Sequence, residues 1–360
     1  MVENFFTLSP EDRREALEVA AYKSGRPAYI LEKDAWVVWA LSALFRSPFG
    51  RHLIFKGGTS LSKVYRAIDR FSEDIDVTYD IRAIPPDLVK NAGPGALPPS
   101  VSQARKWRGI LEERLAKWLN KEVLPYIRSC LDTNKLPATL RIEKGESVYI
   151  DYETRVSGYG YVGPYIKIEF GARSTGEPTV EVSVSCDAAE YLSDVIFPDT
   201  DVRVMRVERT AWEKMTAIHV FCLQGEIKDQ LARHWSDIVR LDTAGHIDAA
   251  INERDIAQHV AEHKSIFFIE KNPEGNRIDY FSAINGGLVL TPEGDALKLL
   301  EVDYAKMVDS RLFLRDPEPL AYIIERCADI QTRANAIGTA GARGSSEVIG
   351  ACPVQASISG

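Results

Sequence analysis

Two aspartates separated by a single residue are the first candidates for chemistry in this sequence. Asp74 and Asp76 lie in a stretch where polar and apolar residues alternate up to Tyr79, and this period of two predicts a strand. Residues two apart on a strand share a face, so the two carboxylates should project together. A divalent cation offsets their repulsion, and Mg²⁺ is normally bound between protein carboxylates and substrate phosphates. The alternative is a solvated acidic strand end.

A glycine-rich turn precedes this strand. An apolar run over residues 53–55 predicts a buried strand, which is followed by the turn Gly57, Gly58, Thr59 and Ser60. Backbone N–H groups and hydroxyls in such a turn can approach a phosphate, with the N-terminus of a short predicted helix behind them. A phosphate-binding turn joined to a carboxylate pair by one short helix predicts a nucleotidyltransferase-type site. A plain tight turn is the alternative.

The middle of the sequence predicts three further strands, over residues 147–154, 165–170 and 179–185. In the second of them, Lys167 and Glu169 share one face. Periodicity leaves two interpretations open, a Lys–Glu pair on a half-exposed strand or a further carboxylate for a metal site. Arg173 follows this strand closely and is a candidate phosphate partner.

Helical periodicity predicts most of the remaining elements. The predicted helices cover residues 9–23, 28–46, 102–124, 208–219, 227–241, 246–263, 296–308 and 317–335. Pro125 should end or kink the third helix. Near the start of the second, the charged triplet Glu32, Lys33 and Asp34 is typical of an exposed turn. Residues 82–100, rich in proline and glycine, predict a loop or flap.

The helix predicted over residues 102–124 has a basic face. Its cationic residues are Arg105, Lys106, Arg108, Arg114, Lys117 and Lys121. Such a face can be solvated and partly paired between successive turns of the helix. A surface that contacts RNA phosphates is the alternative, because phosphate contacts supply much of the affinity for nucleic acid.

Composition places the chain among globular proteins. Its 360 residues, 45% of them hydrophobic and 27% charged, suffice for one large domain or two ordinary ones. The net charge of −8 excludes a generally basic coat protein for DNA, although a local patch can still bind RNA. Five scattered cysteines, no apolar span and no signal-peptide pattern predict a cytoplasmic protein. The small, polar residues 336–360 predict a disordered tail.

Four segments resemble one family of enzymes. FKGGTSLSKVYRAIDRFSEDIDV, residues 55–77, resembles the first motif of the AbiEii/AbiGii-type nucleotidyltransferase toxins, distant relatives of DNA polymerase β. YIKIEFGAR, residues 165–173, resembles the second motif. RTAWEK, residues 209–214, is similar to the motif usually written RTFWEK, and RHWSDI, residues 233–238, to the fourth motif, usually RHYYDL.

The fourth motif departs from the family at Trp235, Ser236 and Ile238 but keeps its histidine and aspartate. Glu32-Lys33-Asp34 looks like the EKD signature that precedes the first motif, and His263-Lys264 also looks family-like. The resemblance covers most of residues 28–270, with the motifs in the family's order.

This resemblance implies an α/β (α+β) fold. A polymerase-β-like core with a small mixed sheet would occupy residues 1–200, and a mainly helical domain residues 201–335. The implied metal ligands are Asp74, Asp76 and Glu169. The implied catalytic residues are Asp74, Asp76, Lys214 and Asp237, with Asp237 as a base or on the acceptor side. The implied nucleotide-binding residues are Gly57, Gly58, Thr59, Ser60, Lys63, Arg173 and Lys214, with Arg209 and His234 as further candidates.

The implied reaction is nucleotidyl transfer from an NTP with Mg²⁺, or Mn²⁺ in its place. The implied acceptor is RNA, with the tRNA 3′ end first, and the implied role is that of the toxin, with a cognate antitoxin, in a type IV toxin–antitoxin or phage-defence pair. Two alternatives stay open: transfer of a nucleotide or phosphate to a protein, and a non-catalytic module that binds a partner. The intact aspartate pair argues against the second.

Overall fold

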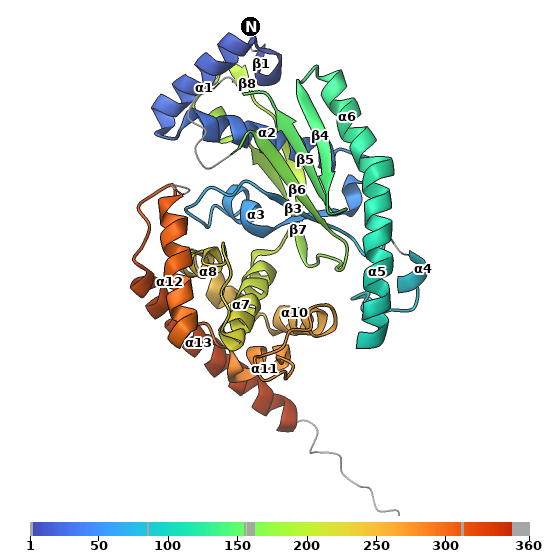
Figure 1. Ribbon diagram of the computed structural model, residues 1–360, viewed down its shortest axis with the longest axis vertical. Helices are drawn as coiled ribbons and strands as arrows, with labels where there is room; N and C mark the ends of the chain where they lie inside the picture. The colour runs from blue at the N-terminus through green and yellow to red at the C-terminus, as the bar shows by residue number, and fades with distance from the viewer. Residues whose placement is uncertain (1–2, 85, 155, 157–162, 311–312, 348–360) are drawn as a thin grey trace, which may run out of the picture. The chain divides into compact units, whose positions relative to one another are not determined.

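A seven-stranded mixed sheet is the centre of the N-terminal part of the chain (Figure 1). The computed structural model describes residues 3–84, 86–154, 156, 163–310 and 313–347. Contacts divide the chain into two units, Met1–Thr210 with Ala305–Pro317 and Ala211–Tyr304 with Glu318–Gly360. The predicted α/β class is confirmed. The functional division at residue 200 stays a prediction.

The strand order in this sheet is β4-β5-β6-β3-β2-β9-β7. Its strands are β2 Leu53–Lys56, β3 Ile75–Tyr79, β4 Ala138–Glu143, β5 Ser147–Tyr152, β6 Tyr165–Gly171, β7 Thr179–Ser185 and β9 Asp199–Met205. A separate parallel pair consists of β1 Glu3–Asn4 and β8 Val195–Ile196. All four alternating stretches that the sequence predicts are confirmed, as β3, β5, β6 and β7.

The two faces of the sheet differ in polarity, because its strands alternate apolar and polar residues. On β6, Ile166, Ile168 and Phe170 are buried, whereas the residues between them are half-buried. The apolar face packs against helices: Trp36 stacks on Tyr152 of β5, and the Trp118 ring lies 5.7 Å from that of Phe170. The opposite face therefore carries the polar side chains of β3 and β6.

The helices of this first unit are α1 Pro10–Ser24, α2 Ala28–Phe45, α3 Gly57–Lys63, α4 Pro86–Val89, α5 Val101–Trp118 and α6 Leu124–Thr133. Short 3-10 turns lie at Phe5–Thr7, Gly50–His52 and Asp187–Glu190. Ser9 and Ser100 cap α1 and α5 by accepting backbone hydrogen bonds from Asp12 and Gln103.

The sequence predicts that Pro125 ends or kinks the helix over residues 102–124, and the structure shows that the chain does not leave the helical state there. A π-helical turn, Leu119–Val123, joins α5 to α6, and the chain stays helical as far as Thr133. Pro125 lies in the first turn of α6, where a missing N–H is tolerated. The wider π turn absorbs the clash that proline makes with the preceding turn.

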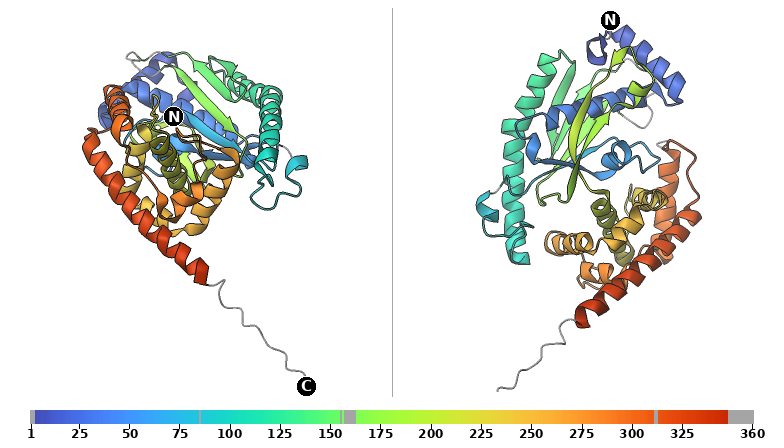
Figure 2. Two further views of the ribbon diagram at one scale, coloured as in Figure 1. Left: turned by 60° about the horizontal axis from the view of Figure 1, so that its bottom comes forward. Right: turned by 180° about the vertical axis from the view of Figure 1, so that it is seen from behind.

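The second unit is helical. Its helices are α7 Val207–Gln224, which begins in the first unit, α8 Arg233–Thr243, α9 His246–Asn252, α10 Arg254–Phe267, α11 Tyr280–Ser282, α12 Gly294–Asp309, which ends in the first unit, and α13 Leu320–Glu347. A π turn occupies Ala283–Gly287. The long helix α13 runs along α8 and α9 (Figure 2). Trp212 and Trp235 are fully buried in this unit.

Part of the segment predicted as a tail is helical. Helix α13 continues through Glu347, and residues 348–360 lie outside those that the structure describes. Within the described residues, no helix is long and apolar enough to cross a membrane.

Candidate active site

The register of the sheet brings carboxylates from two strands together. Asp76 on β3 lies opposite Glu169 on its parallel neighbour β6, and opposite Lys56 on the antiparallel neighbour β2. Asp74 comes directly before β3, two residues back from Asp76 and on the same face. The polar face of the sheet therefore presents Asp74, Asp76 and Glu169 as one group.

Lys167 is the cation that faces this group from β6. Its Nζ lies 2.5 Å from Oε1 of Glu169 and 3.8 Å from Oδ2 of Asp74. Burial raises the pKa of Asp74 to about 6; Lys167 opposes this shift, whereas Glu73, Asp76 and Glu169 add to it. The raised pKa therefore comes first from burial, and the neighbouring carboxylates add to it.

Gly57 lets the turn before α3 approach the second aspartate. Its φ is +77°, and a Cβ atom built on it would lie 2.0 Å from Oδ2 of Asp76. Any other residue would have to adopt an unfavourable left-handed backbone and displace the carboxylate. The glycine of the motif is therefore explained by close contact with the Asp76 side chain.

The hydroxyls of the turn point into the protein. Thr59 donates to the Asp74 carbonyl and lies 3.0 Å from the Ser72 hydroxyl, and Ser60 donates to the Gly57 carbonyl at 2.8 Å. Both residues are buried. The Thr59 hydroxyl thus connects the turn to the loop before β3, and the Ser60 hydroxyl stabilises the turn itself; their expected contact with a phosphate stays a prediction.

Gly58 lies beside this loop. A Cβ atom on Gly58 would lie 2.7 Å from Oγ of Ser72 and 2.9 Å from Nη2 of Arg70. The Arg70 side chain is itself buried. The backbone at Gly58 can therefore lie this close to Ser72 and Arg70 only because glycine has no side chain.

Lys63 is held by carboxylates. Its Nζ lies 2.6 Å from Oδ1 of Asp34 and 2.7 Å from Oδ1 of Asp187, with 7% of its side chain exposed. Burial lowers the pKa of Lys63, but these two carboxylates raise it well above the ordinary value. Asp34 also accepts the Asp187 backbone N–H at 2.7 Å. The geometry therefore gives Lys63 a structural role between Asp34 and Asp187, and its expected contact with a triphosphate stays a prediction.

A polar cavity of about 330 Å³ adjoins this network in the first unit. Its lining includes Lys63, Arg66, Ser72 and Asp187. The three clustered carboxylates of β3 and β6 are not part of that lining. The cavity and the carboxylate group therefore share the loop before β3 without coinciding.

The charged triplet on α2 is buried, in contrast to the exposed turn expected from its composition. Glu32, Lys33 and Asp34 are 3%, 0% and 3% exposed. Lys33 pairs with Glu73, the neighbour of Asp74, and donates to the Gly163 carbonyl at 3.0 Å. Each charge in the triplet has a partner, which is the condition for burying it.

The Lys33–Glu73 pair supports the loop that carries the first aspartate. Burial lowers the pKa of Lys33, and Glu73 and Asp74 oppose that shift. Glu32 accepts a hydrogen bond from the Thr154 hydroxyl at 2.6 Å, beyond the end of β5. Helix α2 thus anchors the loop before β3 and the segment after β5 from one short stretch.

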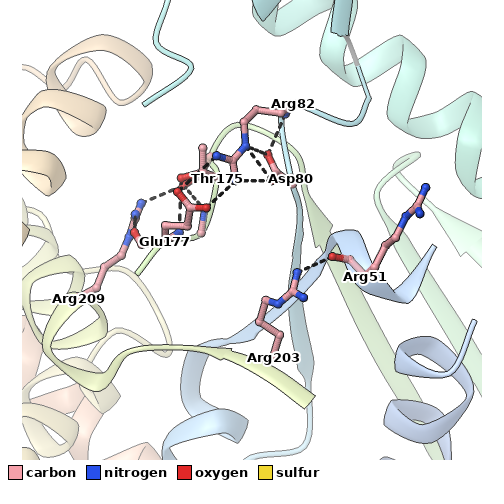
Figure 3. A network of polar contacts seen from close by, with 9 residues as sticks. Arg51, Asp80, Arg82, Thr175, Glu177, Arg203 and Arg209 are labelled. Carbon is pink, nitrogen blue, oxygen red and sulfur yellow. Dashed lines mark hydrogen bonds and ion pairs between the residues drawn. The ribbon is translucent and has the colours of Figure 1, made fainter. Parts of the chain in front are cut away.

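Arg173 and Arg209 lie away from the carboxylates. Arg173 lies two residues beyond the end of β6 and pairs with Glu112 of α5 at 3.2 Å. Arg209 donates to the Glu177 carbonyl and to Oγ of Ser174, in a network at the far end of β3 (Figure 3). These partners give both arginines structural roles in the first unit.

The same network explains how the end of β3 is fixed. Arg82 binds Asp80, the residue after β3, and Glu177, each at 2.6 Å (Figure 3). Arg203 of β9 donates to the Arg51 carbonyl. Asp74 lies at the opposite end of the same strand.

The second unit has a buried ion pair built from two of the predicted residues. Nζ of Lys214 on α7 lies 2.8 Å from Oδ2 of Asp237 on α8, and the two side chains are 9% and 1% exposed. Lys264 of α10 donates to the Glu213 carbonyl at 2.8 Å, next to Lys214. This contact gives the family-like lysine at 264 a role in holding α7.

Most of the fourth motif lies in the core of the second unit, although Arg233 is exposed and His234 half-buried. The His234 ring lies 5.7 Å from that of Phe221, and Trp235 donates its indole N–H to the Leu290 carbonyl at 2.8 Å. Trp235 and Ser236 are buried. The departures from the family pattern therefore change packing inside the second unit.

A sequence comparison now decides the family. The profile of the family described as "Nucleotidyl transferase AbiEii toxin, Type IV TA system" matches residues 39–329. The chain belongs to the AbiEii family. It is therefore a nucleotidyltransferase toxin of the type IV toxin–antitoxin class, and the predicted family and enzyme class are confirmed. No curated protein sequence matches the chain.

Two solved structures resemble this AbiEii protein over most of its length. The nucleotidyltransferase toxin MenT4 of Mycobacterium tuberculosis H37Rv is 14% identical, with 95% of this chain and 97% of that chain covered and a TM-score of 0.41. A protein of H. pylori described as a nucleotidyltransferase is 13% identical, with 84% and 93% covered and a TM-score of 0.41.

Nucleotidyltransferases of this kind use an NTP and a divalent metal ion, and the donor set of this AbiEii protein suits such an ion. Asp74, Asp76 and Glu169 offer carboxylate oxygens from one face of the sheet, where burial and then the acidic neighbours raise the pKa of Asp74. Within the described residues, however, no three acidic, histidine or cysteine side chains are already gathered for a metal. Lys167 fills part of the space between the carboxylates.

Several residues that shape this site were not predicted. Lys33, Glu73 and Asp187 are charged residues of ordinary appearance, and their partners lie between 40 and 161 residues away in the chain. The one local signal was the charged triplet at the start of a strongly apolar helix, since a helix with apolar residues on every side is expected to be buried.

Proposed function

We propose that this AbiEii enzyme transfers a nucleoside monophosphate from an NTP to an RNA hydroxyl, with the tRNA 3′ end as the first choice. The observation that carries the proposal is the register of the sheet, which places Asp76 beside Glu169 and Asp74 on the same face, next to a glycine turn, in a chain of this family. NTP and tRNA are substrates of the cytoplasm, where we place the activity.

We propose Mg²⁺, with Mn²⁺ as its substitute, as the ion held by Asp74, Asp76 and Glu169. When bound, such an ion neutralises phosphate charge and lowers the pKa of a hydroxyl nucleophile. The chain's own contribution is to fix the ligands. Gly57 admits the Asp76 carboxylate, and Glu73, paired with Lys33, holds the loop before Asp74.

We assign Lys214 to the stabilisation of phosphate charge during transfer. Asp237 is 1% exposed and hydrogen-bonded to the Lys214 ammonium. It is therefore a positioning residue for this ammonium in our proposal, in place of a base that takes a proton from the acceptor. The roles of Gly57 and Gly58 as backbone donors to the triphosphate stay part of the proposal.

The basic face of α5 is the proposed RNA surface. Arg114 is paired with Asp87 of α4, and Arg173 with Glu112. The exposed cations are Arg105, Lys106 and Lys117 of α5 and Lys121 of the π turn that follows it. On an acidic chain of net charge −8, binding to RNA phosphates needs a local patch of this kind.

The first test supplies α-³²P-labelled NTPs one at a time with bulk tRNA and Mg²⁺. We expect label on tRNA for the wild type and none for Asp76→Asn. RNase treatment should remove the label and protease should leave it. Label that survives RNase but not protease would show a protein acceptor instead, and no label with any NTP or acceptor would contradict the transferase proposal.

The second test concerns toxicity and the RNA surface. Expressed without an antitoxin, the wild type should arrest bacterial growth, and Asp76→Asn should not. The triple variant R105E/K106E/K117E should relieve toxicity and flatten the salt dependence of tRNA binding, with NTP binding unchanged. A triple variant that stays fully toxic would refute the assignment of α5, and a harmless wild type would refute the toxin role.

A further inference from the structure

Lys167 lies between two members of the carboxylate group, Asp74 and Glu169. It lies on β6 two residues before Glu169, and Asp74 stands two residues before Asp76 on the parallel neighbour β3. The register that pairs Asp76 with Glu169 therefore also brings Asp74 beside Lys167. The Nζ contacts of 2.5 Å to Glu169 and 3.8 Å to Asp74 follow from this arrangement.

The geometry makes the ammonium a bridge between two carboxylates. The side chains of Lys167, Asp74 and Glu169 are 25%, 33% and 42% exposed, so the bridge is partly shielded from water. Burial lowers the pKa of Lys167, but Glu169 and Asp74 raise it above its ordinary value. Lys167 is therefore a cation at neutral pH.

We propose that Lys167 is a resident counter-cation of this site, which a divalent metal ion must displace from Asp74 and Glu169 in order to bind. The inference rests on the proposed function, because it takes these carboxylates as metal ligands. It also explains why the carboxylates are not gathered for a metal among the described residues: Glu169 is held by the ammonium.

The Lys167 ammonium has opposite effects without and with a bound metal ion. Without metal, the ammonium offsets repulsion among Asp74, Asp76 and Glu169 and so stabilises the fold. With metal, the ammonium and the divalent ion repel each other and compete for the same oxygens, which weakens metal binding. A metal ion that arrives with an NTP brings phosphate charge that can accept the displaced ammonium. Lys167 would thus favour the metal–nucleotide complex over the free ion.

The test titrates MnCl₂ into nucleotide-free protein and follows binding by calorimetry. The variants are Lys167→Met, which keeps an apolar stem of similar length, and Lys167→Gln. Both should bind Mn²⁺ about tenfold more tightly than the wild type, as removal of a unit charge beside a divalent ion implies. Lys167→Arg keeps the charge and should retain weak binding. Arg203→Met is the matched control, since Arg203 is a strand cation whose carboxylate partner, Glu181 at 3.6 Å, lies outside the site.

Thermal unfolding gives a second readout that does not depend on activity. Metal-free Lys167→Met should melt below the wild type, and saturating MnCl₂ should raise its melting temperature more than that of the wild type. If the wild type binds Mn²⁺ and neither variant binds it more tightly, the inference is overturned and the transferase proposal is unaffected. No Mn²⁺ binding by any of the proteins would overturn both the inference and the metal site.

Discussion

Neutralising the first aspartate should make the metal-free protein more stable while abolishing transfer. In Asp74→Asn, the crowded carboxylate becomes a neutral amide of nearly the same shape. The pKa of Asp74 is raised from 3.8 to about 6, first by burial and then by Glu73, Asp76 and Glu169. At about 1.4 kcal/mol for each tenfold change in proton affinity, the ionised group costs at most about 3 kcal/mol. Because 33% of the side chain is exposed, solvent screening reduces the expected gain to about 1–2 kcal/mol.

The sign of the pH dependence follows from the direction of the shift. A carboxyl group whose pKa is raised by folding favours the folded state in its protonated form, so its penalty accumulates as pH rises from about 4 to about 6 and is complete above that. The gain from Asp74→Asn should be full at pH 7.5 and absent near pH 3.5. For a unit of about 200 residues, it corresponds to a rise of roughly 3–6 °C in melting temperature.

The assay is thermal unfolding of metal-free protein between pH 4 and 8, with transfer to tRNA measured in parallel. Asp151→Asn is the control, since Asp151 is paired with Arg141 at 2.9 Å on β5 and its loss should not stabilise the protein. Asp74→Asn that melts at or below the wild type at pH 7.5 would refute the crowding argument. Transfer at the wild-type rate would refute the metal-ligand assignment.

Three other substitutions test the supporting contacts. Gly57→Ala should abolish transfer and lower the melting temperature by more than Gly93→Ala. Both glycines have positive φ (+77° and +68°), but only a Cβ at Gly57 meets a carboxylate. Equal decreases in melting temperature by calorimetry would contradict this. Lys63→Met should destabilise the first unit by about 3–5 kcal/mol in urea unfolding by leaving the buried Asp34 carboxylate without its cation. A stable variant with weakened NTP binding would instead support a contact between Lys63 and the triphosphate. Lys214→Ala should lose both stability and transfer, because it leaves the buried Asp237 carboxylate unpaired. The double variant Lys214→Met/Asp237→Leu should regain stability but not transfer. Transfer by this double variant would exclude a role for the Lys214 ammonium.

Local sequence was sufficient to predict the strands that carry the candidate site residues. Alternation over residues 75–79 and 165–170 predicted β3 and β6, because strand period is a property of neighbouring residues. The same periodicity placed Asp74 and Asp76 on one face, and Lys167 and Glu169 on another strand's face. The motif sequence was also enough to indicate the AbiEii family, which the profile match over residues 39–329 confirms.

The tertiary structure decided which of these residues are available for chemistry. Sequence periodicity does not reveal that Lys63 lies between Asp34 and Asp187, since those partners are 29 and 124 residues away. It left open whether Glu169 joins a metal site or pairs with Lys167, and the register of β3 with β6 makes Lys167 a neighbour of Asp74 as well.

The burial of the charged triplet of α2 is the clearest feature that local sequence did not predict. By composition Glu32, Lys33 and Asp34 belong at a surface, because an unpaired charge is costly to bury. They are buried because Thr154, Glu73 and Lys63, from three separate parts of the chain, meet them in space. Sequence by itself determined which side chains could carry charge and on which face of an element they lie. Only the fold determined which charges neutralise one another, since that depends on distances between segments that the chain does not join.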